Sequence, residues 1–150
     1  AAIIIEDYNK GVLSKHLIKD IITFGNDNNI PIFVDPKSDN FFLYKNVTLI
    51  KPNRKEAQNA LGINLRNSDD VITGGKKLLE LLNCQNVLIT LGQQGMMLFQ
   101  QNGDISSVPT HARSVADVSG AGDTAIDVRA GLVEQILKKH HLLPIMHQDW

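Results

Sequence analysis

The chain has 150 residues, 43% of them hydrophobic, and a formal net charge of −1 at pH 7. This length allows one globular core and is short for a two-lobed enzyme, so residues 1–150 are expected to form a single domain or part of one. Acidic and basic residues are interspersed, which excludes the charged surface that nucleic acid or a membrane would need. The expected partner is therefore a small molecule.

The N-terminal run and the single cysteine bear on where the protein works. Residues 2–5 read as a strand already in progress, so further sequence upstream is expected. No segment approaches the roughly 18 apolar residues of a membrane span. Cys84 stands alone, which excludes an internal disulfide framework and suits a reducing compartment. A cytoplasmic protein is the expectation.

Four short apolar runs predict parallel strands that are buried on both faces of a sheet. These runs lie at residues 2–5, 32–34, 47–50 and 87–91. Amphipathic stretches at 14–28 and 68–83 predict helices between them, the second with Ser68 as its N-cap. A shorter helix is expected over 53–61, ended by Gly62.

The pattern changes after the fourth run. Residues 96–100 and 104–108 flank a Gln-Asn-Gly turn, which predicts an antiparallel hairpin. The whole order indicates an α/β fold: a layered, mostly parallel sheet with an antiparallel hairpin and helices on both faces. In such folds ligands gather at the carboxyl ends of the strands.

Polar residues follow the first two predicted strands. Asp7 and Asp35 could accept hydrogen bonds from substrate hydroxyls or a hydrated metal, and Lys37 could bind a phosphate as a mobile point charge. Ordinary solvation of loops explains each of these residues about equally well.

The third predicted strand leads into Lys-Pro-Asn-Arg-Lys-Glu at residues 51–56. Asn53 and Glu56 lie three positions apart at a helix start and share one face, where they could hold the waters of a Mg²⁺ ion that bridges phosphates. A capping box between the same two residues is the competing interpretation.

The fourth predicted strand ends in Thr-Leu-Gly-Gln-Gln-Gly at residues 90–95. The Thr90 hydroxyl and the open backbone at Gly92 and Gly95 suit a nucleotide phosphate. A plain glycine turn into the hairpin explains the same residues.

The run Asp-Val-Ser-Gly-Ala-Gly-Asp-Thr at residues 117–124 is the strongest indication of chemistry. Gly120, Ala121 and Gly122 let backbone N–H groups approach a phosphate at a helix start, where the helix dipole adds positive potential. Asp123 could accept the proton of an attacking hydroxyl. Phosphoryl transfer needs these two functions side by side, so the run predicts an ATP-dependent small-molecule kinase.

Two other interpretations of this run stay open. Residues 120–125 also fit the dinucleotide-binding pattern G-x-G-x-x-A, although no apolar strand precedes them and only one helix follows. A tight glycine turn, with Ser119 or Asp123 capping a helix, needs no chemistry at all.

Taken together and in this order, the segments after the predicted strands and the run at 117–124 resemble the ribokinase-like (PfkB) family of carbohydrate kinases. Residues 6–14, 34–37 and 51–57 look most like the heptose-7-phosphate kinase module of ADP-heptose synthases. The resemblance covers about residues 1–126, and residues 127–150 form an atypical tail.

The resemblance implies a nucleotide and a phosphorylated sugar as partners, with ATP and Mg²⁺ as cofactors. The product would be a 1,7-bisphosphate on the way to ADP-heptose and lipopolysaccharide precursors, so the attacking group would be the anomeric hydroxyl of a heptose 7-phosphate. Position by position, the resemblance makes Asp123 the catalytic base, and Gly120, Ala121 and Gly122 the anion hole. It makes Asn53 and Glu56 the residues that organise Mg²⁺ and the phosphates. Thr90, Gly92 and Gly95 would line the ATP site, and Lys37 would contact a phosphate.

The family's N-terminal half, which supplies most of the sugar site, has no counterpart here. The chain is therefore expected to be the C-terminal part of a kinase domain. A catalytically inactive remnant, an interaction module that keeps the scaffold, and a kinase for another sugar are the alternatives. An incompletely covered sheet also leads us to expect an exposed apolar face and self-association into homo-oligomers.

Overall fold

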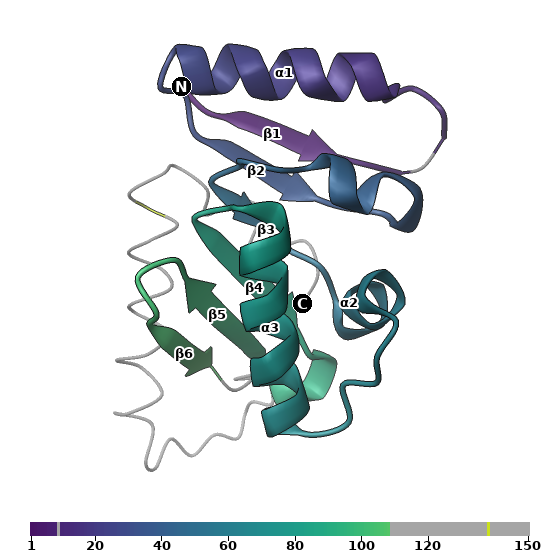
Figure 1. The fold of residues 1–150 in the computed structure, drawn as a ribbon, viewed down its shortest axis with the longest axis vertical. Helices are drawn as coiled ribbons and strands as arrows, with labels where there is room; N and C mark the ends of the chain where they lie inside the picture. Colours follow the sequence, from purple (N-terminus) through teal and green to yellow (C-terminus); the bar gives the residue numbers. More distant parts are fainter. Residues whose placement is uncertain (9, 109–137, 139–150) are drawn as a thin grey trace, which may run out of the picture.

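A six-stranded sheet carries the fold (Figure 1) in the computed structural model, which describes residues 1–8, 10–108 and 138. The strands lie side by side in the order of the sequence, from β1 to β6. The first four are parallel: β1 (Ile3–Glu6), β2 (Ile32–Asp35), β3 (Leu49–Ile50) and β4 (Asn86–Thr90). The hairpin of β5 (Met96–Gln100) and β6 (Ile105–Val108) adds two antiparallel strands.

The strand bounds differ by one or two residues from those expected. The first strand runs to Glu6 rather than ending at Ile5, because Glu6 pairs with Asp35 in the parallel ladder although both are polar. The third strand is reduced to two residues, and Val47 is buried outside it. Apolar runs report burial, whereas strands are defined by backbone pairing, so the two need not end together.

The helices are α1 (Lys15–Asp27), α2 (Arg54–Leu61) and α3 (Ser68–Leu82), with two short 3₁₀ helices, η1 (Ser38–Leu43) and η2 (Gly92–Gln94). Helix α2 ends as expected at Gly62, which takes a left-handed φ of 68°. The N-cap of α3 was predicted wrongly at Ser68. Asn67 is the cap, because its backbone is extended and its side-chain oxygen accepts from the Asp70 amide at 2.9 Å.

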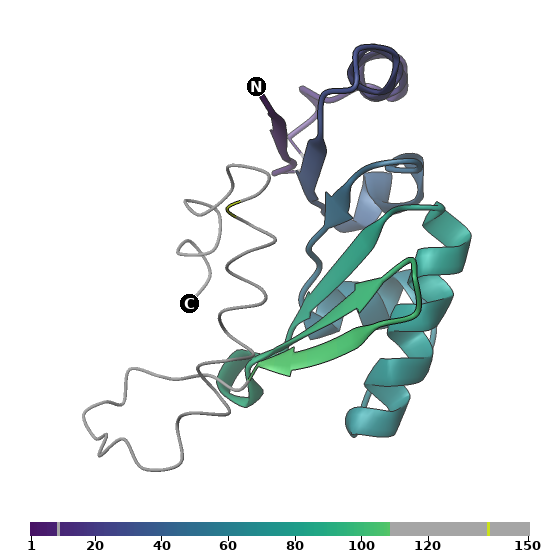
Figure 2. The same ribbon diagram turned by 90° about the vertical axis from the view of Figure 1, so that its left-hand side faces the viewer.

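Helices α1 and α3 lie on the same side of the sheet (Figure 2) and build the core there. Gly75 of α3 faces the buried ring of Phe99 in β5 so closely that an added Cβ would lie 2.3 Å from it. The 3₁₀ helix η1, which the sequence pattern did not indicate, fills the space beside α1 and α2. The core side chains include Ile18, Ile22, Val34, Phe41, Ile50, Leu78, Leu82, Val87 and Phe99.

The sheet is also buried on its second face. Along β2, Phe33 alternates with Ile32 and Val34, so it points away from the helices, and yet only 2% of it is exposed. Leu88 of β4 and Leu98 of β5 are buried as well. The expected burial on both faces is thus confirmed for β2 and β4, whereas on β1 the side chain of Ile4 is 49% exposed. The helix expected after the glycine run at 117–124 lies outside the described residues.

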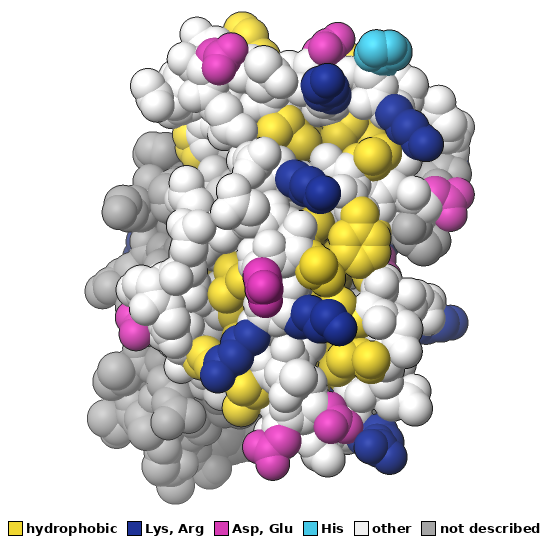
Figure 3. Space-filling view, in the orientation of Figure 1, with side chains coloured by type: hydrophobic (Ala, Val, Ile, Leu, Met, Phe, Trp, Pro, Cys, Tyr) yellow, Lys and Arg dark blue, Asp and Glu magenta, His cyan; other side chains and the backbone are white. Residues whose placement is uncertain are grey.

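Strand β1 forms one edge of the sheet within the described residues. Ile4 on this strand is 49% exposed, and a pocket of about 360 Å³ runs along the strand and the loop that follows it. The exposed apolar surface that was expected is therefore present at this edge. On the face seen in Figure 3, acidic and basic side chains are interspersed, in line with the small net charge.

No helix among the described residues is long and apolar enough to pass through a lipid bilayer.

Candidate functional site

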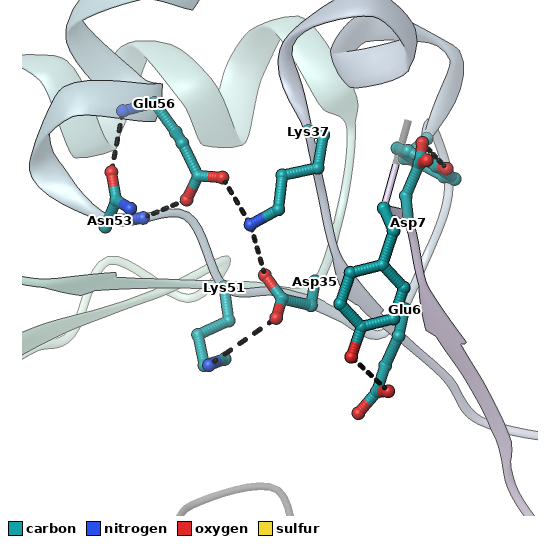
Figure 4. Close-up of polar contacts among 9 residues, drawn as sticks. Glu6, Asp7, Asp35, Lys37, Lys51, Asn53 and Glu56 are labelled. Carbon is teal, nitrogen blue, oxygen red and sulfur yellow. Dashed lines mark hydrogen bonds and ion pairs between the residues drawn. The ribbon is translucent and has the colours of Figure 1, made fainter. Parts of the chain in front are cut away.

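The carboxyl ends of the parallel strands bring the predicted polar residues to one edge of the sheet (Figure 4). The β1–β2 register sets Glu6 beside Asp35, and an isolated parallel bridge sets Asn53 beside Thr90. Ladder pairing therefore fixes the spacing of these positions. The expectation that ligand-binding candidates gather at the strand ends is confirmed for the residues described.

Lys37 lies between two carboxylates that come from different elements (Figure 4). Its Nζ is 3.0 Å from Oε2 of Glu56 and 3.9 Å from Oδ1 of Asp35. On the other side of Asp35, Lys51 Nζ lies 4.0 Å from Oδ2. Asp35 and Glu56 thus alternate with Lys37 and Lys51 in one chain of opposite charges.

The two lysines differ in exposure. The side chain of Lys51 is 6% exposed, whereas that of Lys37 is 38% exposed. A buried ammonium needs a counter-charge, and Asp35 supplies one. Lys51 is therefore held in place by its surroundings, while much more of the Lys37 side chain lies in solvent.

Asn53 and Glu56 form the capping box at the start of α2. The Asn53 side-chain oxygen accepts from the Glu56 amide at 2.8 Å, and Glu56 Oε1 accepts from the Asn53 amide at 2.9 Å. The capping interpretation is thus confirmed, and it uses only one carboxylate oxygen. The other, Oε2, faces Lys37. A role of these residues toward Mg²⁺ and phosphates stays a prediction, which the cap does not contradict.

The segment after β4 folds as a tight glycine turn through η2. Gly92 and Gly95 take φ values of 60° and 90°, which favour glycine, and the Leu91 amide donates to the Gly95 carbonyl at 2.7 Å. The Thr90 amide donates to the Pro52 carbonyl at 3.0 Å, which ties this turn to the start of α2. The two predicted nucleotide-side segments are therefore neighbours, while their contact with ATP stays a prediction.

Arg54 joins the same two segments through its side chain. Its guanidinium donates to the Gln94 side-chain oxygen in η2 and, at 3.1 Å, to the Leu65 carbonyl in the loop after α2. One side chain thereby holds the glycine turn against α2. The sequence reasoning missed this residue, whose only signal was a long cationic side chain next to the predicted cap.

Asp7 is turned inward, toward protein donors. It is 3% exposed and accepts from the Tyr44 hydroxyl at 2.6 Å and from the Asn40 amide nitrogen at 3.0 Å. Burial raises the pKa of Tyr44, and the hydrogen bond to Asp7 raises it further. In this arrangement Asp7 secures the loop after β1 to η1.

Cys84 is fully buried just after the end of α3, in the small apolar role expected of it. Burial raises the pKa of its thiol to about 12.

The predicted catalytic run lies outside the described residues. The base Asp123 and the anion-hole residues Gly120, Ala121 and Gly122 all fall there, and their roles stay predictions.

The donors present at the strand ends suit a hydrated divalent cation. Asp35, Asn53 and Glu56 offer hard oxygen atoms, and Lys37 already places a positive charge between the two carboxylates. Among the described residues no group of three or more His, Cys, Asp or Glu side chains could hold a metal. A cation at this edge would thus need water or phosphate oxygens as well, the usual condition for Mg²⁺.

Comparison with known sequences decides the family. Residues 3–143 match the profile described as pfkB family carbohydrate kinase. The chain belongs to this family. The members of this family, as its description says, are carbohydrate kinases.

Relatives within the pfkB family include the bifunctional protein HldE of several bacteria. The HldE of Geobacter sulfurreducens is 41% identical over 126 residues, which cover 84% of this chain and 26% of that protein. The HldE of Aliarcobacter butzleri is 43% identical over 126 residues, with the same coverage. The chain thus spans about a quarter of the length of the relatives it matches.

Two solved structures share the fold. Phosphofructokinase-2 from Escherichia coli, in complex with fructose-6-phosphate, matches with a TM-score of 0.63 at 19% identity, over 85% of this chain and 42% of that chain. Ribokinase from Arabidopsis thaliana, complexed with ribose and ATP, matches with a TM-score of 0.62 at 20% identity, over 85% of this chain and 43% of that chain. The sheet described above is therefore ribokinase-like.

Proposed function

We propose that this chain is the nucleotide-side part of an ATP-dependent sugar kinase that phosphorylates the anomeric hydroxyl of a heptose 7-phosphate. The identity of 41% with an HldE over 84% of the chain carries the proposal. The meeting of Lys37, Glu56 and Thr90 at one sheet edge supports it, because this is where an α/β fold binds its ligand.

In this proposal the glycine run supplies the chemistry of transfer. Backbone amides at Gly120, Ala121 and Gly122 stabilise the charge on the transferring phosphoryl group, and Asp123 takes the proton from the sugar hydroxyl. The hydroxyl oxygen that Asp123 deprotonates attacks the phosphoryl group whose charge the amides stabilise. The base and the amides must therefore be adjacent. Their adjacency in sequence is what supports this assignment.

The strand-end residues then hold the nucleotide. Thr90, Gly92 and Gly95 line the ATP site in this proposal, and the two glycines place no side chain between their turn and a phosphate. Asn53 and Glu56 would hold Mg²⁺ through water, and Lys37 would contact a phosphate. When bound, Mg²⁺ would neutralise charge on the phosphates.

The proposed reaction belongs to the cytoplasmic synthesis of ADP-heptose, a precursor of lipopolysaccharide. Its substrates carry phosphate groups, so the enzyme must meet them in an aqueous compartment that holds ATP. A second sugar, such as a fructose phosphate or ribose, would use the same nucleotide side with a different acceptor.

The first test is calorimetric titration of Mg·ATP into the purified chain. Saturable binding, with a rise in thermal midpoint, supports the kinase proposal. Absence of both heat and thermal shift would identify the chain as an inactive remnant or an interaction module that keeps the scaffold.

The second test concerns the base and needs a longer protein that includes the sugar-binding part. Asp123→Asn should abolish transfer to heptose 7-phosphate while leaving Mg·ATP affinity largely unchanged, because the side chain acts on the acceptor hydroxyl. Full activity in this variant would reject Asp123 as the base. A panel of phosphorylated and unphosphorylated sugars, tried with the unaltered longer protein, identifies the acceptor.

A further inference from the structure

The position of Lys37 is that of a cation held between two anions. Its Nζ lies 3.0 Å from Glu56 Oε2 and 3.9 Å from Asp35 Oδ1. Glu56 belongs to the start of α2, and Asp35 belongs to the end of β2. The flexible four-carbon side chain of Lys37 places its ammonium group between these two carboxylates.

A divalent cation bound at Glu56 would compete with the ammonium for the same oxygen. Glu56 Oε1 already accepts from the Asn53 amide, so Oε2, which accepts from Lys37, is the carboxylate atom for which a cation would compete. Two positive charges cannot share this oxygen at short range without strong repulsion. The cation can therefore approach only as Lys37 withdraws.

The exposure of the two lysines shows which of them can withdraw. Lys37 is 38% exposed and reaches solvent, whereas Lys51 is 6% exposed and stays 4.0 Å from Asp35. Asp35 thus keeps a counter-charge after Lys37 has left. The site offers one fixed ammonium and one exchangeable ammonium.

We propose that Lys37 is the resident cation of the nucleotide-free site and that a divalent cation displaces it from Glu56, after which its ammonium pairs with a phosphate oxygen of the nucleotide. The displacement couples the metal to the phosphate: the ion frees the lysine, and the phosphate gives the lysine a new partner. This inference rests on the proposed nucleotide site and adds to it an exchange that makes metal and nucleotide bind together.

The test measures binding of Mn²⁺ alone, by electron paramagnetic resonance, to the chain without nucleotide. Lys37→Met keeps the approximate length of the side chain and removes its charge, so it should bind Mn²⁺ about tenfold more tightly than the unaltered chain. A tenfold change is about the effect that one neighbouring charge has on the ionisation constant of a carboxyl group. Lys55→Met removes an exposed charge next to Glu56 and should leave Mn²⁺ affinity within about twofold. Lys37→Gln serves as a second neutral variant if the methionine variant does not fold.

The second arm measures Mg·ATP by calorimetry. Lys37→Met should bind Mg·ATP more weakly than the unaltered chain although it binds the bare ion more tightly, and this opposite change is the signature of exchange. Equal Mn²⁺ affinity in the unaltered chain and in both neutral variants, or an equal gain in Lys55→Met, overturns the inference. Absence of Mn²⁺ binding in all of them overturns it too.

The two arms separate this inference from the proposed function. Mg·ATP binding by the unaltered chain with no gain in Mn²⁺ affinity in Lys37→Met rejects the exchange and leaves the kinase proposal. A gain in Mn²⁺ affinity without any Mg·ATP binding supports displacement of Lys37 by the ion and rejects the nucleotide site.

Discussion

The hydroxyl of Tyr44 donates a 2.6 Å hydrogen bond to the carboxylate of Asp7, 37 residues away, and both side chains are buried. This contact joins the loop after β1 to the end of η1. It also gives a buried carboxylate one of its protein donors, so its loss is costly.

Tyr44→Phe removes only the oxygen and should lower the free energy of unfolding by about 1–3 kcal/mol, the usual cost of leaving a buried acceptor unsatisfied. Urea denaturation near neutral pH measures the loss. Tyr8→Phe is the matched control, because Tyr8 is 65% exposed and its hydroxyl donates to Glu6 at the surface, so its effect should stay within about 0.5 kcal/mol. Equal losses in the two variants would contradict a special role for the buried bond.

The same pair predicts a dependence on alkaline pH. The pKa of Tyr44 is higher in the folded protein than in the unfolded chain. The contribution of its hydroxyl to the free energy of unfolding is therefore complete below about pH 10 and is lost as the pH rises toward the folded pKa. The stability difference between the unaltered chain and Tyr44→Phe should therefore narrow in strongly alkaline buffer. Denaturation at about pH 8 and about pH 10.5 gives the comparison.

The capping box allows the structural role of Asn53 to be separated from its proposed role at the nucleotide. Asn53→Ala should cost about 1 kcal/mol through loss of the cap, whereas Asn53→Asp keeps a good cap and should be nearly neutral. In calorimetry Asn53→Asp should still weaken Mg·ATP, because it replaces an amide with a second negative charge beside the phosphates.

Asn67→Ala, which removes the cap of α3, is the control for that experiment. It should lose a similar amount of stability and leave Mg·ATP affinity unchanged. If Asn53→Asp binds Mg·ATP as tightly as the unaltered chain, Asn53 is a helix cap and nothing more.

Gly75 is expected to tolerate no side chain, even though it lies within a helix. An alanine Cβ would come within 2.3 Å of the buried Phe99 ring, so Gly75→Ala should cost about 1–3 kcal/mol by overpacking. Thr73→Ala, on the exposed face of the same helix, should gain a few tenths of a kcal/mol through helix propensity. Thermal denaturation of both variants tests this, and a stabilised Gly75→Ala would show that the ring moves freely.

The edge strand β1 should cause self-association. Ile4 is 49% exposed on the strand that ends the sheet among the described residues, and edge strands pair readily with another copy, so light scattering of the purified chain should report species larger than a monomer. Ile4→Lys should shift the distribution toward monomer, because charge on an edge strand opposes pairing. Leu81→Lys, at a similarly exposed apolar residue of α3, should have little effect, and a monomeric unaltered chain would contradict the prediction.

Local sequence signals predicted element ends well where interactions between residues close in sequence set those ends. Asn53 and Gly62 marked the ends of α2 because capping chemistry involves only residues within one turn. The Asn-Gly turn before Asp104 likewise marked the hairpin. The prediction of Ser68 as the cap of α3 was wrong, because the preceding Asn67 is an equally good cap by residue type and the backbone conformation decides between them.

By itself, then, the order of apolar runs, caps and glycine turns determined that this protein is an α/β sheet with phosphate-binding candidates after its strands. Only the tertiary structure decided that Lys37 bonds Glu56, that Lys51 is buried against Asp35 and that Arg54 reaches Gln94. These pairs join residues that are far apart in sequence, and their distances depend on which strand ends are neighbours in the sheet. Local propensity does not specify the order of the strands in the sheet, because this order is set only when the strands pair and the core packs.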